Sequence, residues 1–150
     1  MTTAMNALVD TNILVRLSDA DSPLCTVCNS AVQRLLGRGD NLHLCAQIAI
    51  EFWAVATRPT HVRSLGLSAT DAEAALRNAE QWLSWLSEPS DIGARWRALV
   101  NKHGVLGKQA HDTRLVALME AHSLKDLLTL NTADFARFEE INCLDPAGIS

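Results

Sequence analysis

Short apolar runs alternate along the chain with longer segments in which apolar residues recur every three or four positions. A short uninterrupted apolar run predicts a buried strand, whereas the longer spacing predicts a helix with one buried face. The predicted strands are 6–10, 42–45, 127–130 and 141–144. The predicted helices are 11–17, 23–37, 47–58, 70–86, 92–100, 112–122 and 132–138.

The alternation of strands and helices predicts an α/β fold, a three-layer α/β/α sandwich with a mainly parallel central sheet. No linker, repeat or block of charge divides the sequence, and its 150 residues suit one domain with a substantial core. We therefore expect a single domain over 1–150. Ligands of such sheets bind beyond the carboxyl ends of the strands, so acidic residues that follow strands are the first candidates for chemistry.

The predicted helix 70–86 carries two further signals. Thr70 and Glu73 have the spacing of a capping box, which predicts where the helix begins. Trp82 and Trp85 widen its apolar stripe beyond what one core contact requires. Two interpretations stay open, a wide core-facing stripe and a surplus that forms an interface with another protein.

Composition and charge narrow the class of protein. Hydrophobic residues make up 48% of the chain, and glycine and proline number only 7 and 4, which excludes a disordered polymer. No apolar run approaches the ~20 residues that cross a bilayer. The first residues lack the basic segment of a secretory signal, so we expect a cytoplasmic protein.

The net charge is mildly acidic, −4, from 13 basic and 17 acidic residues. Domains that grip nucleic acid mainly by neutralising phosphates are usually basic. Any contact with nucleic acid must therefore be local, brief or assisted by a metal ion. An acidic balance does not exclude a nuclease, because the catalytic pocket of such an enzyme is itself acidic.

The four cysteines raise the question of a zinc or redox site. Cys25 and Cys28 form a C-x-x-C pair, and the nearest second pair is His43 with Cys45. A structural zinc site requires two such pairs at suitable spacing. Cys25 and Cys28 also share one face of a predicted helix, where free cysteine packs as a small hydrophobe. We favour core packing over metal or redox chemistry.

Four carboxylates stand out by position. Asp10, Asp112 and Asp134 lie at or just after a strand end or a helix start, and Glu51 is the only charged residue within 48–56. Each also has a structural interpretation. Asp10 and Asp112 suit helix caps, and Asp134 suits the first turn of a helix. A buried Glu51 must be paired, neutral or bound to a metal ion.

The predicted fold can bring all four carboxylates to one edge of the sheet. At about 5 Å and an effective dielectric of about 20, each like-charged pair costs roughly 3 kcal/mol. A divalent cation such as Mg²⁺ or Mn²⁺ offsets that repulsion and prefers oxygen ligands. Asn12 and Thr132 lie beside these acids in the sequence and fit such a pocket. Asp126 precedes its strand, so we expect it at the opposite edge.

Four segments in this order resemble the PIN-domain ribonucleases, and among them the VapC-type toxins of type II toxin–antitoxin modules. The resemblance covers nearly the whole chain. The segments are Val-Asp-Thr-Asn-Ile-Leu at 9–14, Glu-Phe-Trp-Ala-Val-Ala-Thr-Arg-Pro at 51–59, His-Asp-Thr-Arg-Leu-Val-Ala at 111–117 and Leu-Thr-Leu-Asn-Thr-Ala-Asp-Phe at 128–135.

The resemblance implies an endoribonuclease that uses Mg²⁺ or Mn²⁺. It implies that Asp10, Glu51, Asp112 and Asp134 hold the metal or position water, supported by Asn12 and Thr132. It also implies a homodimer and a neutralising antitoxin protein as a partner.

Four basic residues lie near these acids in the sequence or by helical reach and could hold the flanking phosphates of an RNA substrate. They are Arg16, Arg58, Lys108 and Arg114. Each is equally well explained as a solvated side chain or as one half of an ion pair, such as Arg58 with Glu51.

Three other functions compete with the toxin. A haloacid-dehalogenase-like phosphatase also begins with an acid after its first strand, but it requires a second aspartate where this chain has Asn12. A housekeeping RNA-processing PIN nuclease would have the same site without an antitoxin. A catalytically silent PIN-like binding module would not require all four acids.

Overall fold

A parallel sheet lies at the centre of the molecule. The computed structural model describes residues 3–60 and 65–150 of the chain. Within those residues the sheet has five strands in the order β3-β2-β1-β4-β5, and every neighbouring pair is parallel. The strands are β1 (Asn6–Val9), β2 (Asn41–Leu44), β3 (Ser84–Trp85), β4 (Asp126–Leu128) and β5 (Asn142–Leu144). The single-domain prediction over 1–150 also covers positions 1–2 and 61–64, which lie outside the described residues.

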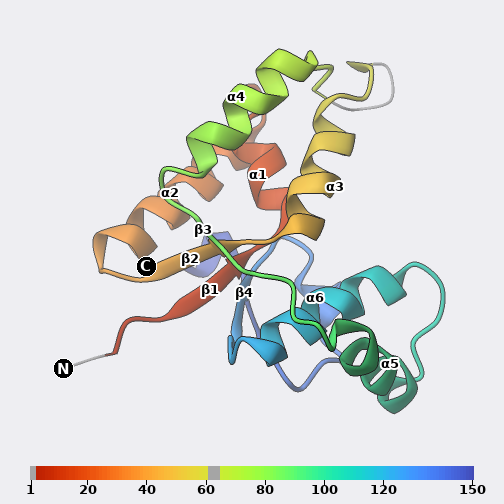
Figure 1. Cartoon of the computed structure of the whole chain (residues 1–150). Helices are drawn as coiled ribbons and strands as arrows, with labels where there is room; N and C mark the ends of the chain where they lie inside the picture. The colour runs from red at the N-terminus through yellow and green to blue at the C-terminus, as the bar shows by residue number, and fades with distance from the viewer. Residues whose placement is uncertain (1–2, 61–64) are drawn as a thin grey trace.

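Helices cover both faces of this sheet (Figure 1). Helices α1 (Thr11–Leu17), α2 (Pro23–Gly37), α3 (Ala46–Ala56) and α4 (Ala69–Ala79) lie on one side, and α5 (Ile92–His103) and α6 (Gln109–Ala121) lie on the other. The short α7 (Thr132–Phe135) connects β4 to β5, and a 3₁₀ turn (Pro146–Gly148) packs on α2. The predicted three-layer α/β/α sandwich is confirmed.

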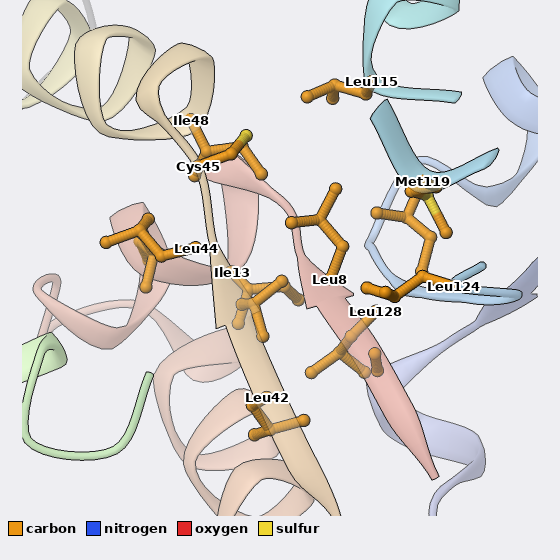
Figure 2. Close-up of a cluster of buried hydrophobic side chains, with 14 of the residues drawn as sticks. Leu8, Ile13, Leu42, Leu44, Cys45, Ile48, Leu115, Met119, Leu124 and Leu128 are labelled. Carbon is orange, nitrogen blue, oxygen red and sulfur yellow. The ribbon is translucent and has the colours of Figure 1, made fainter. Parts of the chain in front are cut away.

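The strands are short and apolar because both faces of the sheet are buried. Ala7, Leu8 and Val9 of β1 are completely buried, and successive side chains point to opposite faces. Figure 2 shows Leu115 and Met119 of α6 on one side of β1 and residues of the α1–α3 layer on the other. The core therefore has two halves, with β1 between them.

Chain winding reverses at β1. The chain adds β2 and then β3 on one side of β1, crosses the sheet through α5 and α6, and adds β4 and β5 on the other side. A crevice at the carboxyl ends of the strands is expected at such a reversal, because the neighbouring connections leave in opposite directions.

The predicted helix 70–86 is wrong beyond Ala79. Ser84 and Trp85 instead pair with His43 and Leu44 as the edge strand β3, and the Leu86 amide donates to the Leu44 carbonyl at 2.7 Å. The predicted cap is also wrong, because Ser68 caps α4 by accepting from the Asp71 amide at 3.1 Å. Pairing with the sheet overrides the apolar periodicity of the segment.

Other boundaries shift by a few residues. Strand β4 ends at Leu128, two residues before the predicted end, and α6 begins at Gln109 rather than at residue 112. Helix α7 ends at Phe135 instead of residue 138. Helix α5 continues to His103, where Gly104 closes it with a left-handed φ of 59°. The earlier start of α6 places Asp112 within the first turn of the helix instead of at its cap.

The cysteines are free thiols, and Cys28 is completely buried in the core. This confirms the prediction of core packing for Cys28, while Cys25 is half-buried one helical turn earlier. No helix among the described residues is long and apolar enough to span a membrane.

Candidate active site

The four predicted acids approach the carboxyl ends of the central strands. Asp10 directly follows β1, and Asp134 lies on α7 after the neighbouring β4. Glu51 lies on α3 and Asp112 in the first turn of α6. The charges of Asp10, Asp134 and Glu51 all act on the carboxyl of Asp112. Side chains more than 120 residues apart in sequence therefore share one electrostatic environment.

Asp10 is the most buried of the four, with 6% of its surface exposed. Its Oδ1 accepts from the Thr11 amide at 2.8 Å, so it also caps α1. Its Oδ2 accepts from Thr129 Oγ1 at 2.9 Å and from Asn12 Nδ2 at 3.2 Å. Burial raises the pKa of Asp10, the hydrogen bonds oppose that shift, and the charge of Glu51 adds to it.

Thr129 and Asn12 form a rigid support for Asp10. Asn12 Nδ2 also donates to Thr129 Oγ1 at 3.1 Å, and Asn12 Oδ1 accepts from the Leu130 amide at 3.0 Å. Asn12 therefore contacts Asp10 from the neighbouring turn and ties it to the end of β4. The predicted supporting residue Thr132 is not part of this network; it is half-buried at the start of α7.

Sequence reasoning missed Thr129, although a signal was present. It is the only polar residue in the run 127–130, and it is completely buried. A polar side chain isolated in an apolar run must find a hydrogen-bond partner when the run is buried. The same argument singled out Glu51, and it applies equally to Thr129.

Both carboxylate oxygens of Glu51 accept hydrogen bonds. Thr11 Oγ1 donates to Oε2 at 3.2 Å, and Gln47 Nε2 donates to Oε1 at 3.1 Å. The alternative in which Arg58 pairs with Glu51 is wrong, since the two form no ion pair and Arg58 is exposed beyond the end of α3. Glu51 is thus oriented by two neutral donors rather than by a cation.

Asp112 is half-buried and does not cap its helix, since Lys108 occupies the cap position of α6. Burial raises the pKa of Asp112 to about 6, with further contributions from the charges of Asp10, Asp134 and Glu51, while His111 opposes the shift. The interpretation of Asp112 as a helix cap is therefore wrong, because Lys108 holds that position. The fourth acid, Asp134, is exposed on α7.

The donor chemistry of these acids fits a divalent cation, because carboxylate oxygens are the ligands that Mg²⁺ and Mn²⁺ prefer. Within residues 3–60 and 65–150, however, no three Asp, Glu, His or Cys side chains lie close enough to hold a metal ion as they stand. The acids are close enough for their charges to interact, but too far apart to coordinate one ion together. A cation would have to draw them together.

The four basic residues have different surroundings. Arg16 pairs with Asp19 at 3.6 Å near the end of α1, and Arg114 contacts both Gln47 and Glu88. Arg58 and Lys108 are exposed beside α3 and α6. The predicted contacts with RNA phosphates stay a prediction, and Arg58 and Lys108 are the more accessible pair.

A separate groove of about 670 Å³ lies between α1, α2 and α4. Its lining includes Leu14 of α1, Val32 of α2 and Leu76 of α4, and none of the four acids. Trp82 also lines it, whereas Trp85 is exposed on β3 and donates from Nε1 to Glu80 at 2.7 Å. The two tryptophans therefore do not share one helical face.

Comparison with known proteins places this arrangement in a family. The model of the PIN domain matches residues 7–141. The chain is 27% identical over 147 residues to Ribonuclease VapC48 of Mycobacterium tuberculosis, covering 95% of this chain and 98% of that protein.

Two solved structures show the same fold. A toxin-antitoxin complex from Klebsiella pneumoniae is 23% identical with a TM-score of 0.64, over 93% of this chain and 97% of the other. VapBC-1 from nontypeable Haemophilus influenzae is 16% identical with a TM-score of 0.67, over 95% and 98%. The family match runs from β1 to beyond α7 and includes all four acids, so the chain belongs to the PIN domain family.

Proposed function

We propose that this PIN-domain protein is a metal-dependent endoribonuclease toxin that acts in the cytoplasm and is neutralised by a cognate antitoxin. The observation that carries the proposal is the electrostatic convergence of Asp10, Glu51 and Asp134 on Asp112. Like charges gathered at one sheet edge destabilise a metal-free fold, and such groups of perturbed acids are typical of functional sites. The similarity to a ribonuclease supports the same conclusion.

Asp10, Glu51, Asp112 and Asp134 would hold Mg²⁺ or Mn²⁺. When bound, such an ion offsets charge that develops on a phosphodiester and makes a water molecule more acidic. The protein's own contribution is orientation. Thr129 and Asn12 fix one oxygen of Asp10, and Thr11 fixes one oxygen of Glu51. Among the described residues, Thr132 makes no hydrogen bond to either acid, so we propose Thr129 for the supporting role instead.

The negative charges of the four acids repel the phosphates of an approaching RNA strand. Arg58 and Lys108 are exposed and free to contact flanking phosphates, whereas Arg16 and Arg114 already have partners within the described residues. The formal net charge of −4 allows only local contact with an anionic strand.

An antitoxin is proposed as the protein partner because similar structures are toxin-antitoxin assemblies. The groove between α1, α2 and α4 offers apolar side chains such as Leu76 and Trp82 to a segment of that partner. We also propose a homodimer, which is supported by Ile50, a large apolar side chain that is 68% exposed on α3.

Incubation of the purified chain with total RNA tests the nuclease directly. Cleavage with Mg²⁺ or Mn²⁺, its loss in EDTA and its loss in Asp10→Asn are the expected results. Asp126→Asn is the matched control, because Asp126 begins β4 opposite Ala7, at the far edge of the sheet. Intact RNA under all conditions would contradict the proposal.

Expression without a partner separates the toxin from a housekeeping nuclease. A toxin arrests growth when it is produced alone, and the arrest is absent in Asp10→Asn. Normal growth together with RNA cleavage in vitro would favour the housekeeping enzyme. Normal growth without cleavage would favour a silent binding module.

A further inference from the structure

Gln47 lies between two of the acids and contacts the surroundings of both. It is 8% exposed on the first turns of α3, one helical turn before Glu51. Its Nε2 donates to Glu51 Oε1 at 3.1 Å and to the His111 carbonyl at 2.8 Å. His111 is the residue before Asp112. One amide group therefore connects the Glu51 carboxylate with the backbone that carries Asp112.

The orientation of the Gln47 amide follows from its neighbours. A carboxylate and a carbonyl can only accept, so they require the NH₂ group. Arg114 can only donate, and its Nη1 lies 2.8 Å from Gln47 Oε1. Rotation of the amide by half a turn would place two acceptors together and face the guanidinium with a donor. Arg114 and His111 thus fix which side of Gln47 faces Glu51.

Arg114 is itself held from outside the site. Its Nη2 donates to Glu88, which lies in the segment between β3 and α5. A planar guanidinium can serve two acceptors at fixed angles, which a lysine ammonium cannot reproduce. The continuous path Glu88–Arg114–Gln47–Glu51 ends at a carboxylate whose other oxygen is held by Thr11.

We propose that Gln47 is a positioning residue that sets Glu51 relative to Asp112, and that Arg114 fixes the orientation of the Gln47 amide. This inference rests on the proposed metal-dependent nuclease. It gives Arg114 a role inside the protein in place of the predicted contact with RNA. Groups that orient metal-binding residues affect metal affinity and activity about 10- to 100-fold.

The first test replaces the amide by an apolar side chain of similar length, Gln47→Met. We expect Mn²⁺ affinity, measured by calorimetry, and kcat for RNA cleavage each to fall about 10- to 100-fold, with KM unchanged. Gln81→Met is the control, because Gln81 is exposed just after α4. A purely structural Gln47 predicts a lower Tm in EDTA with unchanged Mn²⁺ affinity, which would overturn the inference.

Arg114→Lys provides a second variant that keeps the positive charge. We expect a smaller loss of Mn²⁺ affinity than in Gln47→Met, because one ammonium cannot hold Gln47 and Glu88 together. Arg77→Lys on the exposed face of α4 is the matched control. Wild-type Mn²⁺ affinity in Arg114→Lys would remove Arg114 from the proposal.

A charge exchange between Arg114 and Glu88 separates orientation from ion pairing. The double variant Arg114→Glu/Glu88→Arg restores the pair but presents Gln47 with an acceptor. The amide must then turn its NH₂ away from Glu51. We expect the double variant to recover Tm but not Mn²⁺ affinity. Recovery of both would overturn the orienting role.

The wild-type chain distinguishes failure of this inference from failure of the proposed function. A wild-type chain that neither binds Mn²⁺ nor cleaves RNA overturns both. An active, Mn²⁺-binding wild type whose Gln47→Met variant keeps its affinity overturns the positioning role alone.

Discussion

Burial gives individual polar residues their roles in this protein. Asp10 and Thr129 are buried together and satisfy one another, while Glu51 is held by Thr11 and Gln47. Burial, together with the charges of Asp10, Asp134 and Glu51, raises the pKa of Asp112 to about 6. Burial raises the pKa of Asp10 as well, so both carboxyls carry a stability cost when they are charged.

Removing the Asp112 charge should stabilise the metal-free protein. The raised pKa, from 3.8 to about 6, means that folding disfavours the charged carboxyl. The contribution of Asp112 to stability therefore falls as the pH rises from 3.8 to about 6, and Asp112→Asn lacks this contribution. Because the side chain is half-exposed, solvent screening reduces the effect. We expect Asp112→Asn to raise the free energy of unfolding by about 1–2 kcal/mol at pH 7 and not to raise it below pH 4.

Thermal unfolding in EDTA across this pH range measures the gain, with Asp21→Asn in the exposed loop between α1 and α2 as the control. The same Asp112→Asn variant should lack RNA cleavage. A variant that is less stable than the wild type at pH 7 would contradict the electrostatic account of the site.

Chemical type and local pattern single out four acids that the structure brings into one electrostatic environment, but they do not reveal the side chains that hold those acids. Glu51 was recognisable as a lone charge in an apolar helix, and Asp10 as an acid after a strand. The sequence favours Thr132 because it lies just before Asp134, whereas Thr129 reads as one more residue of a strand predicted over 127–130. Thr129 donates to Asp10 across 119 positions of sequence, a contact that local sequence does not encode.

At the scale of elements, tertiary pairing decided the cases that local pattern could not. The apolar positions of 70–86 have helical spacing throughout, but an edge position beside β2 was open to Ser84 and Trp85. Strand β3 has only two residues, too few for an alternating pattern to reveal it. By contrast, the helices with strong punctuation, such as α1 after Asp10 and α2 after Ser22, begin where predicted.

The start of α4 offers a test of the capping assignment. Ser68 accepts from the Asp71 amide, so Ser68→Ala should reduce the free energy of unfolding by about 1 kcal/mol. Thr70→Ala, at the residue that the sequence favoured, should change it by much less. Urea denaturation of both variants measures the difference. An equal or larger effect at Thr70 would contradict the observed helix start.

At the scale of the whole molecule, the groove and the acids lie on different parts of the surface. This separation predicts that Leu76→Glu weakens antitoxin binding about tenfold or more while leaving RNA cleavage intact. Binding is measured by co-purification with the proposed antitoxin. Leu106→Glu is the control, since Leu106 is 84% exposed between α5 and α6. Parallel loss of cleavage would argue against separate surfaces.

The proposed homodimer depends on the exposed face of α3 that carries Ile50. Ile50 is exposed beside Glu51, so Ile50→Lys should convert a dimer into a monomer in sedimentation equilibrium. Leu106→Lys should leave the dimer intact. A monomeric wild type would show that the homodimer proposal is wrong.

Because the winding reverses at β1, the four acids come from two different parts of the chain. Asp10 and Glu51 come from the part of the chain that builds one flank of the sheet, and Asp112 and Asp134 from the part that builds the other. Neither flank alone possesses more than two of the acids. Separation of α6 from the sheet would therefore move Asp112 away from Asp10 and Glu51, and would inactivate the proposed nuclease without any contact with the acids themselves.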